Sequence, residues 1–338
     1  MGISALRAGW IAALDRGNLC ALYRRDDLAA EDEAPVTQSW RITYGTGVML
    51  AAVGALCWSF GGALVRLTDR LDAWQIIFYR STTLLICMLV WLVIQHKGHL
   101  VTAFRHAGVN AMIAGLAVGT AGLTFIASLF YTTVAQSIFM TGLSPFMSAL
   151  LGLWILRERV ASITWIAMVI ALIGMLIILS VGGGQGSMIG TALAIYSAFC
   201  FSCYAVLLRW GQNTEMTVAL VWNAVFLIAV STFVLLVPTG LREMTPQPFL
   251  IGWKNFAACV ALGSVQVTLG LALFTFGSRA VPAAQLSLIA LIEPTFSPLW
   301  AWLVAGEVPP IMTFIGGAVI LAAIAFQALM RVRQSRLA

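Results

Sequence analysis

The chain has very little charge. Of its 338 residues only 9% are Asp, Glu, Lys or Arg, whereas 61% are hydrophobic, and the mean hydropathy is +0.95. Soluble domains carry about 25% charged residues, so this composition excludes a folded soluble protein. The formal net charge is +6, and the positions of the basic residues, given below, explain it without a nucleic-acid partner.

Motifs for ATP hydrolysis, metal binding and secretion are also missing. No G-x-x-x-x-G-K-[ST] motif occurs, so ATP-driven transport would need a separate subunit. The C-x-x-C of Cys200 and Cys203 lacks the second pair that a zinc site needs. We therefore expect neither a metal nor a cofactor. No small-residue cleavage site follows the first apolar stretch, so we do not expect a signal peptide.

Long apolar segments fill the rest of the chain. About 20 apolar residues cross a bilayer as a helix, and ten segments are long enough. The predicted fold is therefore an all-α integral membrane protein with ten transmembrane helices and short connections, the longest around 96–107 and 238–251. The expected spans are 46–66, 73–94, 108–131, 134–156, 162–180, 188–209, 216–237, 252–277, 283–305 and 310–330.

One half of the chain repeats the other. At one constant offset, four positions of the first half match the second: Ala135, Gln136, Pro145 and Glu158 align with Ala284, Gln285, Pro294 and Glu307. At another offset, Gly47, Ala51, Ser59 and Arg66 align with Gly190, Ala194, Ser202 and Arg209. Each half has an odd number of spans, so the halves insert with opposite orientation, as in secondary transporters. We expect a flexible cytoplasmic tail over 1–44 and inverted five-helix repeats over 45–181 and 187–331.

The basic residues indicate the orientation. With the N-terminus inside, ten basic residues lie in the inner segments and four in the outer loops, which is a positive-inside bias. The inner set is Arg41, Lys97, Arg105, Arg157, Arg159, Arg209, Arg279, Arg331, Arg333 and Arg336, and the outer set is Arg66, Arg70, Arg242 and Lys254. We expect both termini in the cytoplasm, an inner-membrane location, and a basic face against anionic lipid.

Several short motifs carry a family resemblance. They are Thr141 to Ser148, Leu156 to Arg159, Leu291 to Pro298 and Ala305 to Glu307, together with Gly54 to Ser59 and Phe78 to Arg80. Over roughly residues 45–331 the chain resembles the EamA domain of the drug/metabolite transporter superfamily. This resemblance implies a ten-helix bundle that carries small metabolites across a bacterial-type inner membrane, and it does not name the cargo.

Glu293 is the strongest candidate for a coupling residue. It lies at the centre of the ninth expected span, where a charge costs about 3 kcal/mol or more. Pro294 removes the backbone hydrogen bond to the carbonyl of Ala290, and Pro145 is the matching helix-breaking residue of the fourth span. A carboxyl beside a broken helix is typical of a coupling site, so we expect proton binding at Glu293. The alternative is a neutral Glu that shapes the kink.

Arg80 is the strongest candidate for substrate binding. It lies about two turns into the second span, ~10 Å below the outer surface. It either extends its side chain to that surface or binds a carboxylate or phosphate in the centre. Its repeat partner is the uncharged Asn223. The other predicted substrate-binding residues are aromatic or polar side chains at mid-depth: Trp58, Ser59, Tyr79, Gln136, Thr141, Ser202, Tyr204 and Gln285.

Three functions remain open from the sequence. The favoured one is a secondary transporter that exports small metabolites such as amino acids, coupled to protons. The second is a passive channel or facilitator, whose flux follows the substrate gradient. A membrane-embedded enzyme is disfavoured because the loops lack clustered catalytic side chains. The expected partners are a small-molecule substrate and membrane lipid, a homodimer stays open, and Glu158 and Glu307 are expected to be structural residues near helix ends.

Overall fold

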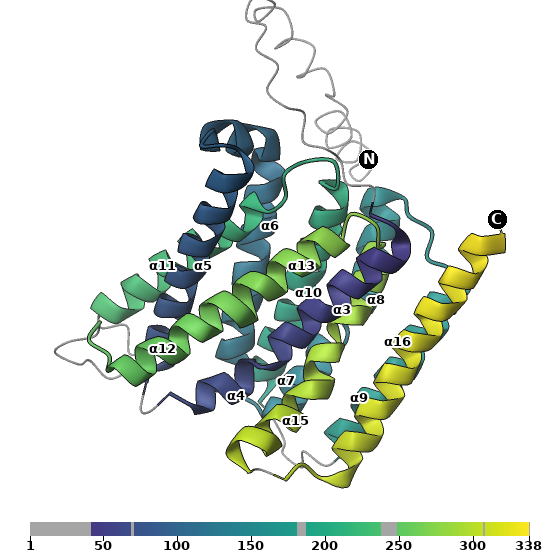
Figure 1. The fold of residues 1–338 in the computed structure, drawn as a ribbon. Helices are drawn as coiled ribbons and strands as arrows, with labels where there is room; N and C mark the ends of the chain where they lie inside the picture. Colours follow the sequence, from purple (N-terminus) through teal and green to yellow (C-terminus); the bar gives the residue numbers. More distant parts are fainter. Residues whose placement is uncertain (1–41, 69–70, 181–186, 238–248, 307, 338) are drawn as a thin grey trace, which may run out of the picture. The chain divides into compact units, whose positions relative to one another are not determined.

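The computed structural model describes residues 42–68, 71–180, 187–237, 249–306 and 308–337. Within these ranges the chain is helical, without a strand, and ten helices are long and apolar enough to cross a membrane. The predicted all-α membrane fold is therefore confirmed (Figure 1). The tail up to residue 41, the link over 181–186 and Glu307 lie outside the described residues.

Six spans are single helices and four are composite. The single helices are α5 (Ala73–Gln95), α6 (Leu100–Ser128), α9 (Ser162–Leu179), α10 (Met188–Trp210), α11 (Val218–Leu236) and α16 (Ile311–Leu337). The composite spans are α3 (Tyr44–Ser59) with α4 (Gly61–Arg66); α7 (Val134–Thr141) with α8 (Ser144–Leu151) and the π-helix η1 (Gly152–Leu156); α12 (Trp253–Ala261) with the π-helix η2 (Leu262–Leu269) and α13 (Gly270–Gly277); and α14 (Ala283–Ala290) with α15 (Ile292–Ala305).

The expected boundary of the third span needs a correction. Its helix begins at Leu100 and not at residue 108, so most of the loop expected around 96–107 is helical. Gly108 interrupts this helix with a φ of 64°, a left-handed conformation that glycine adopts without steric cost. The kink separates a short helical segment from the apolar part that spans the membrane. The last helix also continues beyond residue 330, because no Pro or Gly follows there to end it.

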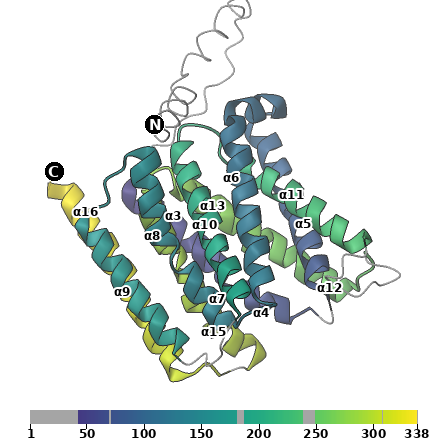
Figure 2. The same cartoon turned by 180° about the vertical axis from the view of Figure 1, so that it is seen from behind.

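The helices of the two halves make matching contacts. Helices α10 and α11 of the second half pack on α6 of the first half, and correspondingly α3 and α5 of the first half pack on α13 and η2 of the second. Three further pairs join equivalent helices: α9 with α16, α5 with α11, and α8 with α14. Figures 1 and 2 show the α9–α16 and α6–α10 pairs from opposite sides. The contact pattern is thus unchanged when the halves are exchanged, which fits the expected repeats.

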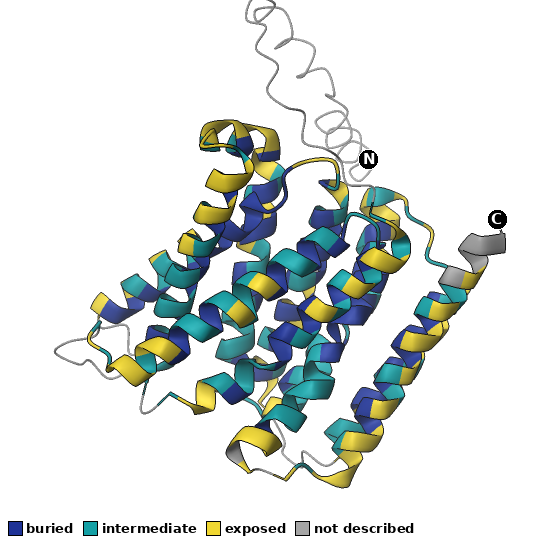
Figure 3. Cartoon of the chain, in the orientation of Figure 1, coloured by how far each residue is buried: buried dark blue, intermediate teal, exposed yellow. Residues whose placement is uncertain are grey.

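Glycines bring several of these helices together. A Cβ built on Gly54 would lie 2.7 Å from the carbonyl oxygen of Gly270, and one built on Gly174 would lie 2.7 Å from that of Gly316. Lipid supplies no hydrophobic force between helices, so close backbone contact is a main source of their association. The faces turned away from other helices carry the exposed residues (Figure 3).

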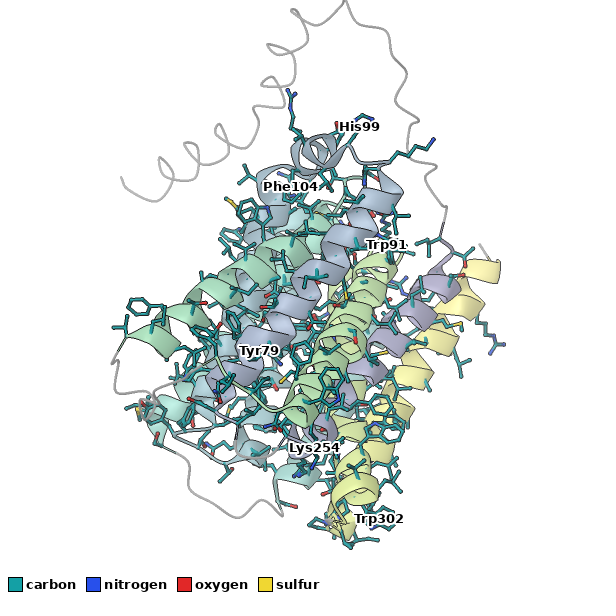
Figure 4. All side chains as sticks on the ribbon, turned by 60° about the vertical axis from the view of Figure 1, so that its left-hand side comes forward. Tyr79, Trp91, His99, Phe104, Lys254 and Trp302 are labelled. Atoms are coloured by element: carbon teal, nitrogen blue, oxygen red, sulfur yellow. The ribbon has the colours of Figure 1, made fainter. Side chains whose placement is uncertain are left out.

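The two ends of the bundle differ in the residues they carry. Figure 4 shows His99 and Phe104 at one end and Lys254 and Trp302 at the other, with Tyr79 between them. Trp302 is exposed, as expected for an aromatic residue at a membrane–water interface.

Candidate substrate site

Three composite spans meet in one region of the bundle: the first span, formed by α3 and α4, contacts both the eighth span, which contains η2, and the ninth span, formed by α14 and α15. The boundary between α3 and α4 lies at Phe60, and that between α14 and α15 lies at Leu291. Both α3 and α4 pack against η2 and against α15. Pro294 follows in the first turn of α15, where its missing amide hydrogen is tolerated. The equivalent break in the first half precedes Pro145, in the first turn of α8. At both boundaries the backbone amide bonds to the carbonyl three residues earlier, so the regular α-helical pattern is interrupted near the middle of the spans.

Arg80 lies beside this region on α5. A Cβ built on Gly263 of η2 would lie 2.6 Å from the Arg80 carbonyl oxygen, so the two backbones are in direct contact. The Arg80 Nε is buried and has no hydrogen-bond partner among the described residues. A buried donor without a partner is unusual in a native structure. The guanidinium is therefore available to a ligand.

Glu293 and Arg80 interact electrostatically without forming an ion pair. The Glu293 side chain is partly exposed, and Arg80 is the charged group within electrostatic range of its carboxyl. No nitrogen–oxygen distance of 4.0 Å or less joins these two residues, whereas Arg209 and Glu158 meet at 2.8 Å elsewhere in the described chain. The cation and the acid thus share one region, and neither neutralises the other by direct contact.

One face of α15 directs Glu293 toward the break in the first span. Residues four and seven positions after Glu293 lie on the same helix face. Of these, Trp300 donates a hydrogen bond from Nε1 to Ser59 Oγ at 2.8 Å and stacks on Phe60 with ring centroids 4.3 Å apart. Ser297 lies 3.3 Å from where a Cβ on Gly62 would be. Both contacts place this face of α15 against the α3–α4 boundary.

Gln266 of η2 lies against the break in the first span, and the sequence did not single it out. Its amide nitrogen lies 3.1 Å from where a Cβ on Gly61 would be, so it rests against the break in the first span. Its Oε1 is buried without a hydrogen-bond partner among the described residues. The available signal is an amide near the middle of an apolar span. The repeat, which marks Gln136 and Gln285, does not mark Gln266.

Exposure differs sharply along the ninth span. Every residue of α14 is buried, whereas all residues from Glu293 to Trp300 are partly exposed (Figure 3). Neighbouring helices therefore enclose α14 more completely than the first part of α15. The candidate site lies beside this less enclosed segment.

Two predicted substrate-binding residues, Tyr204 and Trp58, lie in an aromatic core instead, and a third, Ser202, bonds to the backbone. Tyr204 is fully buried, and its hydroxyl lies 3.1 Å from Thr275 Oγ1. Trp58 packs on Phe274 with ring centroids 4.7 Å apart. Ser202 donates a hydrogen bond to the Ser144 carbonyl at 2.9 Å, which joins α10 to the break in the fourth span. The polar groups of Tyr204 and Ser202 already have protein partners in this conformation.

The remaining predicted residues also have partners within the protein. Gln136 donates to Thr191 Oγ1 at 2.8 Å, Thr141 donates to the Ile138 carbonyl at 2.8 Å, and the Tyr79 hydroxyl donates to the Phe249 carbonyl. Of the predicted set, the structure brings Ser59, Arg80 and Glu293 to one region. Tyr79 packs beside it with Leu64 and Leu262, but its hydroxyl is bonded to the Phe249 carbonyl.

Gln285 belongs to the closed end of the bundle. It accepts a hydrogen bond from the Tyr44 hydroxyl at 2.9 Å and donates to Thr164 Oγ1 at 3.3 Å. It also lines a cavity of about 20 Å³ together with Glu158 and Arg331. That volume holds about one water molecule, whereas metabolite sites measure about 300–1,000 Å³. This cavity is therefore not a substrate site in this conformation.

An ion-pair network ties this closed end together. Arg209 Nε lies 2.8 Å from Glu158 Oε1, and Arg209 Nη1 donates to the Arg279 carbonyl at 2.8 Å. These contacts connect the end of α10, the segment after η1 and the loop between α13 and α14. This geometry fits the expected structural role of Glu158. Among the described residues, no three His, Cys, Asp or Glu side chains are placed to hold a metal ion.

Comparisons with known proteins agree with this architecture. The family model described as the EamA-like transporter family matches residues 45–180 and 188–329. The pseudopaline exporter CntI of Pseudomonas aeruginosa PAO1 is 24% identical over 283 residues, which cover 82% of this chain and 94% of that protein. An uncharacterized transporter of Vibrio cholerae is 25% identical over 266 residues, 77% of this chain and 84% of that one. A protein of known crystal structure aligns with a TM-score of 0.68 at 17% identity over 85% of this chain and 98% of that one, which shows a shared fold.

Proposed function

The chain belongs to the EamA-like transporter family of multi-pass membrane proteins, and from this premise we propose that it exports a small metabolite with an anionic group across the inner membrane, in exchange for protons. Amino acids are the class of cargo that fits best. The observation that carries the proposal is the pairing of Arg80 with Glu293, close enough to interact yet without an ion pair, where three interrupted helices meet.

The charges of the site suit a zwitterion. The Arg80 guanidinium offers planar donors that match a carboxylate, and its Nε has no partner among the described residues. An ionised Glu293 would hold the ammonium group of the same molecule. A proton on Glu293 removes that attraction, so the proton and the substrate exclude one another. Mutually exclusive binding is what an exchanger needs, and a passive facilitator needs no such competition.

Two observations support export as the direction. The relative from Pseudomonas aeruginosa is named as an exporter and aligns over 94% of its length. The excess of basic residues favours cytoplasmic termini, and with that orientation the Arg209–Glu158 network closes the cytoplasmic end. The partly exposed face of α15 would then face outward, in a conformation that releases cargo and takes up a proton.

An untargeted comparison of metabolites inside and outside cells tests this function. Cells expressing the wild-type chain are compared with cells expressing Arg80→Gln and Arg333→Gln, which removes an exposed arginine near the end of α16. We expect carboxylate-bearing metabolites to move from the cells to the medium with wild type and with Arg333→Gln, and not with Arg80→Gln. The proposal fails if no metabolite moves, or if the same metabolites move regardless of Arg80.

A further inference from the structure

We propose that Gln266 binds the substrate directly, next to the anionic group held by Arg80, and thereby selects cargo with a hydrogen-bonding group beside its carboxylate. This inference rests on the proposed function and assigns a role within that same site. It begins from the position of Gln266, which lies on η2 between the broken first span and α5.

The Gln266 amide packs against Gly61, and its oxygen finds no hydrogen-bond partner among the described residues. Its nitrogen lies 3.1 Å and its amide carbon 3.3 Å from where a Cβ on Gly61 would be, and Gly61 has no side chain. Its Oε1 is buried without a partner. An unsatisfied buried amide oxygen is costly, so a side chain that only stabilised the bundle would be expected to hydrogen-bond within it. A substrate N–H or O–H group would satisfy this oxygen.

The same stretch of π-helix positions Gln266 relative to Arg80. Gly263, three residues earlier, contacts the Arg80 backbone, because a Cβ there would lie 2.6 Å from the Arg80 carbonyl oxygen. Thr268 Oγ1 donates to the Gly263 carbonyl at 2.7 Å, across five residues, which is the spacing of a π-helical turn. π-Helical turns are rare and often lie at functional sites. Here the turn holds the Gln266 amide three residues from the glycine that contacts Arg80.

The amide is chemically suited to neutral recognition. Glutamine offers both an acceptor and donors, and which atom faces a ligand depends on rotation of the amide. It adds no charge to a region that already holds a cation and an acid. Arg80 would therefore require the anionic group of the cargo, and Gln266 would discriminate between molecules that share that group and differ beside it.

Cysteine labelling tests whether Gln266 lines the aqueous path, without knowledge of the cargo. Gln266→Cys is compared with Val265→Cys, the neighbouring position, whose side chain is 45% exposed on the outside of the bundle. Intact cells are treated with sulfonatoethyl methanethiosulfonate (anionic) or trimethylammonioethyl methanethiosulfonate (cationic). Mass spectrometry of the peptide measures modification at each position, which separates it from the native cysteines.

We expect Gln266→Cys to react about tenfold faster with the anionic reagent than with the cationic one, because Arg80 concentrates anions. Adding Arg80→Gln should remove this preference, and Val265→Cys should react slowly with both reagents. The inference is overturned if Gln266→Cys reacts no faster than Val265→Cys, or if it prefers the cationic reagent. This result does not depend on transport, so it is separate from a failure of the proposed function.

The export profile supplies the second readout. Gln266→Leu should lower export of metabolites with an amino or hydroxyl group beside the carboxylate about fivefold relative to simple carboxylates, as for one lost neutral hydrogen bond. Gln266→Asn keeps an amide and should recover part of the discrimination, and Val265→Leu should match wild type. An unchanged ratio in Gln266→Leu, with folded protein in the membrane, would overturn the inference.

Discussion

Replacing Arg80 should affect binding without affecting folding. Arg80 has no ion pair or hydrogen bond through its Nε among the described residues, so Arg80→Gln breaks no such contact and removes only the longer-range charge that acts on Glu293. It also removes a desolvated cation, which is itself unfavourable. The free energy of unfolding should therefore stay the same or increase. A charge-assisted hydrogen bond to the cargo is worth about 1.5–3 kcal/mol, so the apparent affinity should fall about ten- to hundredfold.

Arg209 provides the matched comparison. Arg209→Gln loses the ion pair with Glu158 at 2.8 Å and the hydrogen bond to the Arg279 carbonyl at 2.8 Å. The pair is partly exposed, with side-chain exposures of 19% and 28%, so its contribution is at most about 1 kcal/mol. With the carbonyl contact, the total loss is about 2 kcal/mol. This variant should unfold at a lower temperature.

Two assays separate the variants. Thermal unfolding of detergent-solubilised protein should rank Arg209→Gln below wild type and Arg80→Gln at or above it. Export per folded molecule should be reduced most by Arg80→Gln. The reasoning is refuted if Arg80→Gln is as unstable as Arg209→Gln, or if it exports cargo with wild-type affinity, in which case the Arg80 side chain extends to the outer surface and does not bind cargo.

Two further predictions concern packing and topology. Gly263→Ala forces a Cβ to within 2.6 Å of the Arg80 carbonyl oxygen, so it should lower the free energy of unfolding by about 1–3 kcal/mol. Gly122→Ala meets nothing within 4 Å and should leave stability unchanged or slightly raised. Equal melting temperatures of the two variants would contradict the close approach of Gly263 to Arg80. Reporter fusions after Arg105 and Arg157 should be located in the cytoplasm, and a fusion after Thr132 in the periplasm, because loops rich in Lys and Arg stay on the cytoplasmic side. The reverse pattern would contradict the expected orientation.

The spans and the family could be predicted from the sequence because both depend on local properties. Apolar length identifies a membrane helix wherever it packs, and ten helices of that kind are present in the described residues. The alignment of Pro145 with Pro294 likewise needs no three-dimensional information. The start of the third helix was wrong because hydropathy does not detect a short helical segment that precedes a glycine kink.

The composition of the site could be predicted only in part. Arg80 and Glu293 stand out because charge is rare in lipid, and the structure places them within electrostatic range. Tyr204 and Trp58 have suitable chemistry, but hydropathy does not tell which face of a helix points to a neighbour, and they pack around Phe274. Gln266 depends on a π-helical turn, which no periodicity in the sequence indicates.

The most direct test of proton exchange is transport by Glu293→Gln in proteoliposomes. The Gln side chain keeps the size and hydrogen-bonding capacity of Glu293 but cannot carry a proton, so it cannot couple the two fluxes. The cargo identified by the metabolite comparison is supplied with and without an imposed pH gradient. Wild type should accumulate it only with the gradient, and Glu293→Gln should lose that accumulation while still exchanging labelled for unlabelled cargo at higher concentrations. Unchanged gradient-driven accumulation by Glu293→Gln would contradict the proposal and leave Glu293 with a structural role.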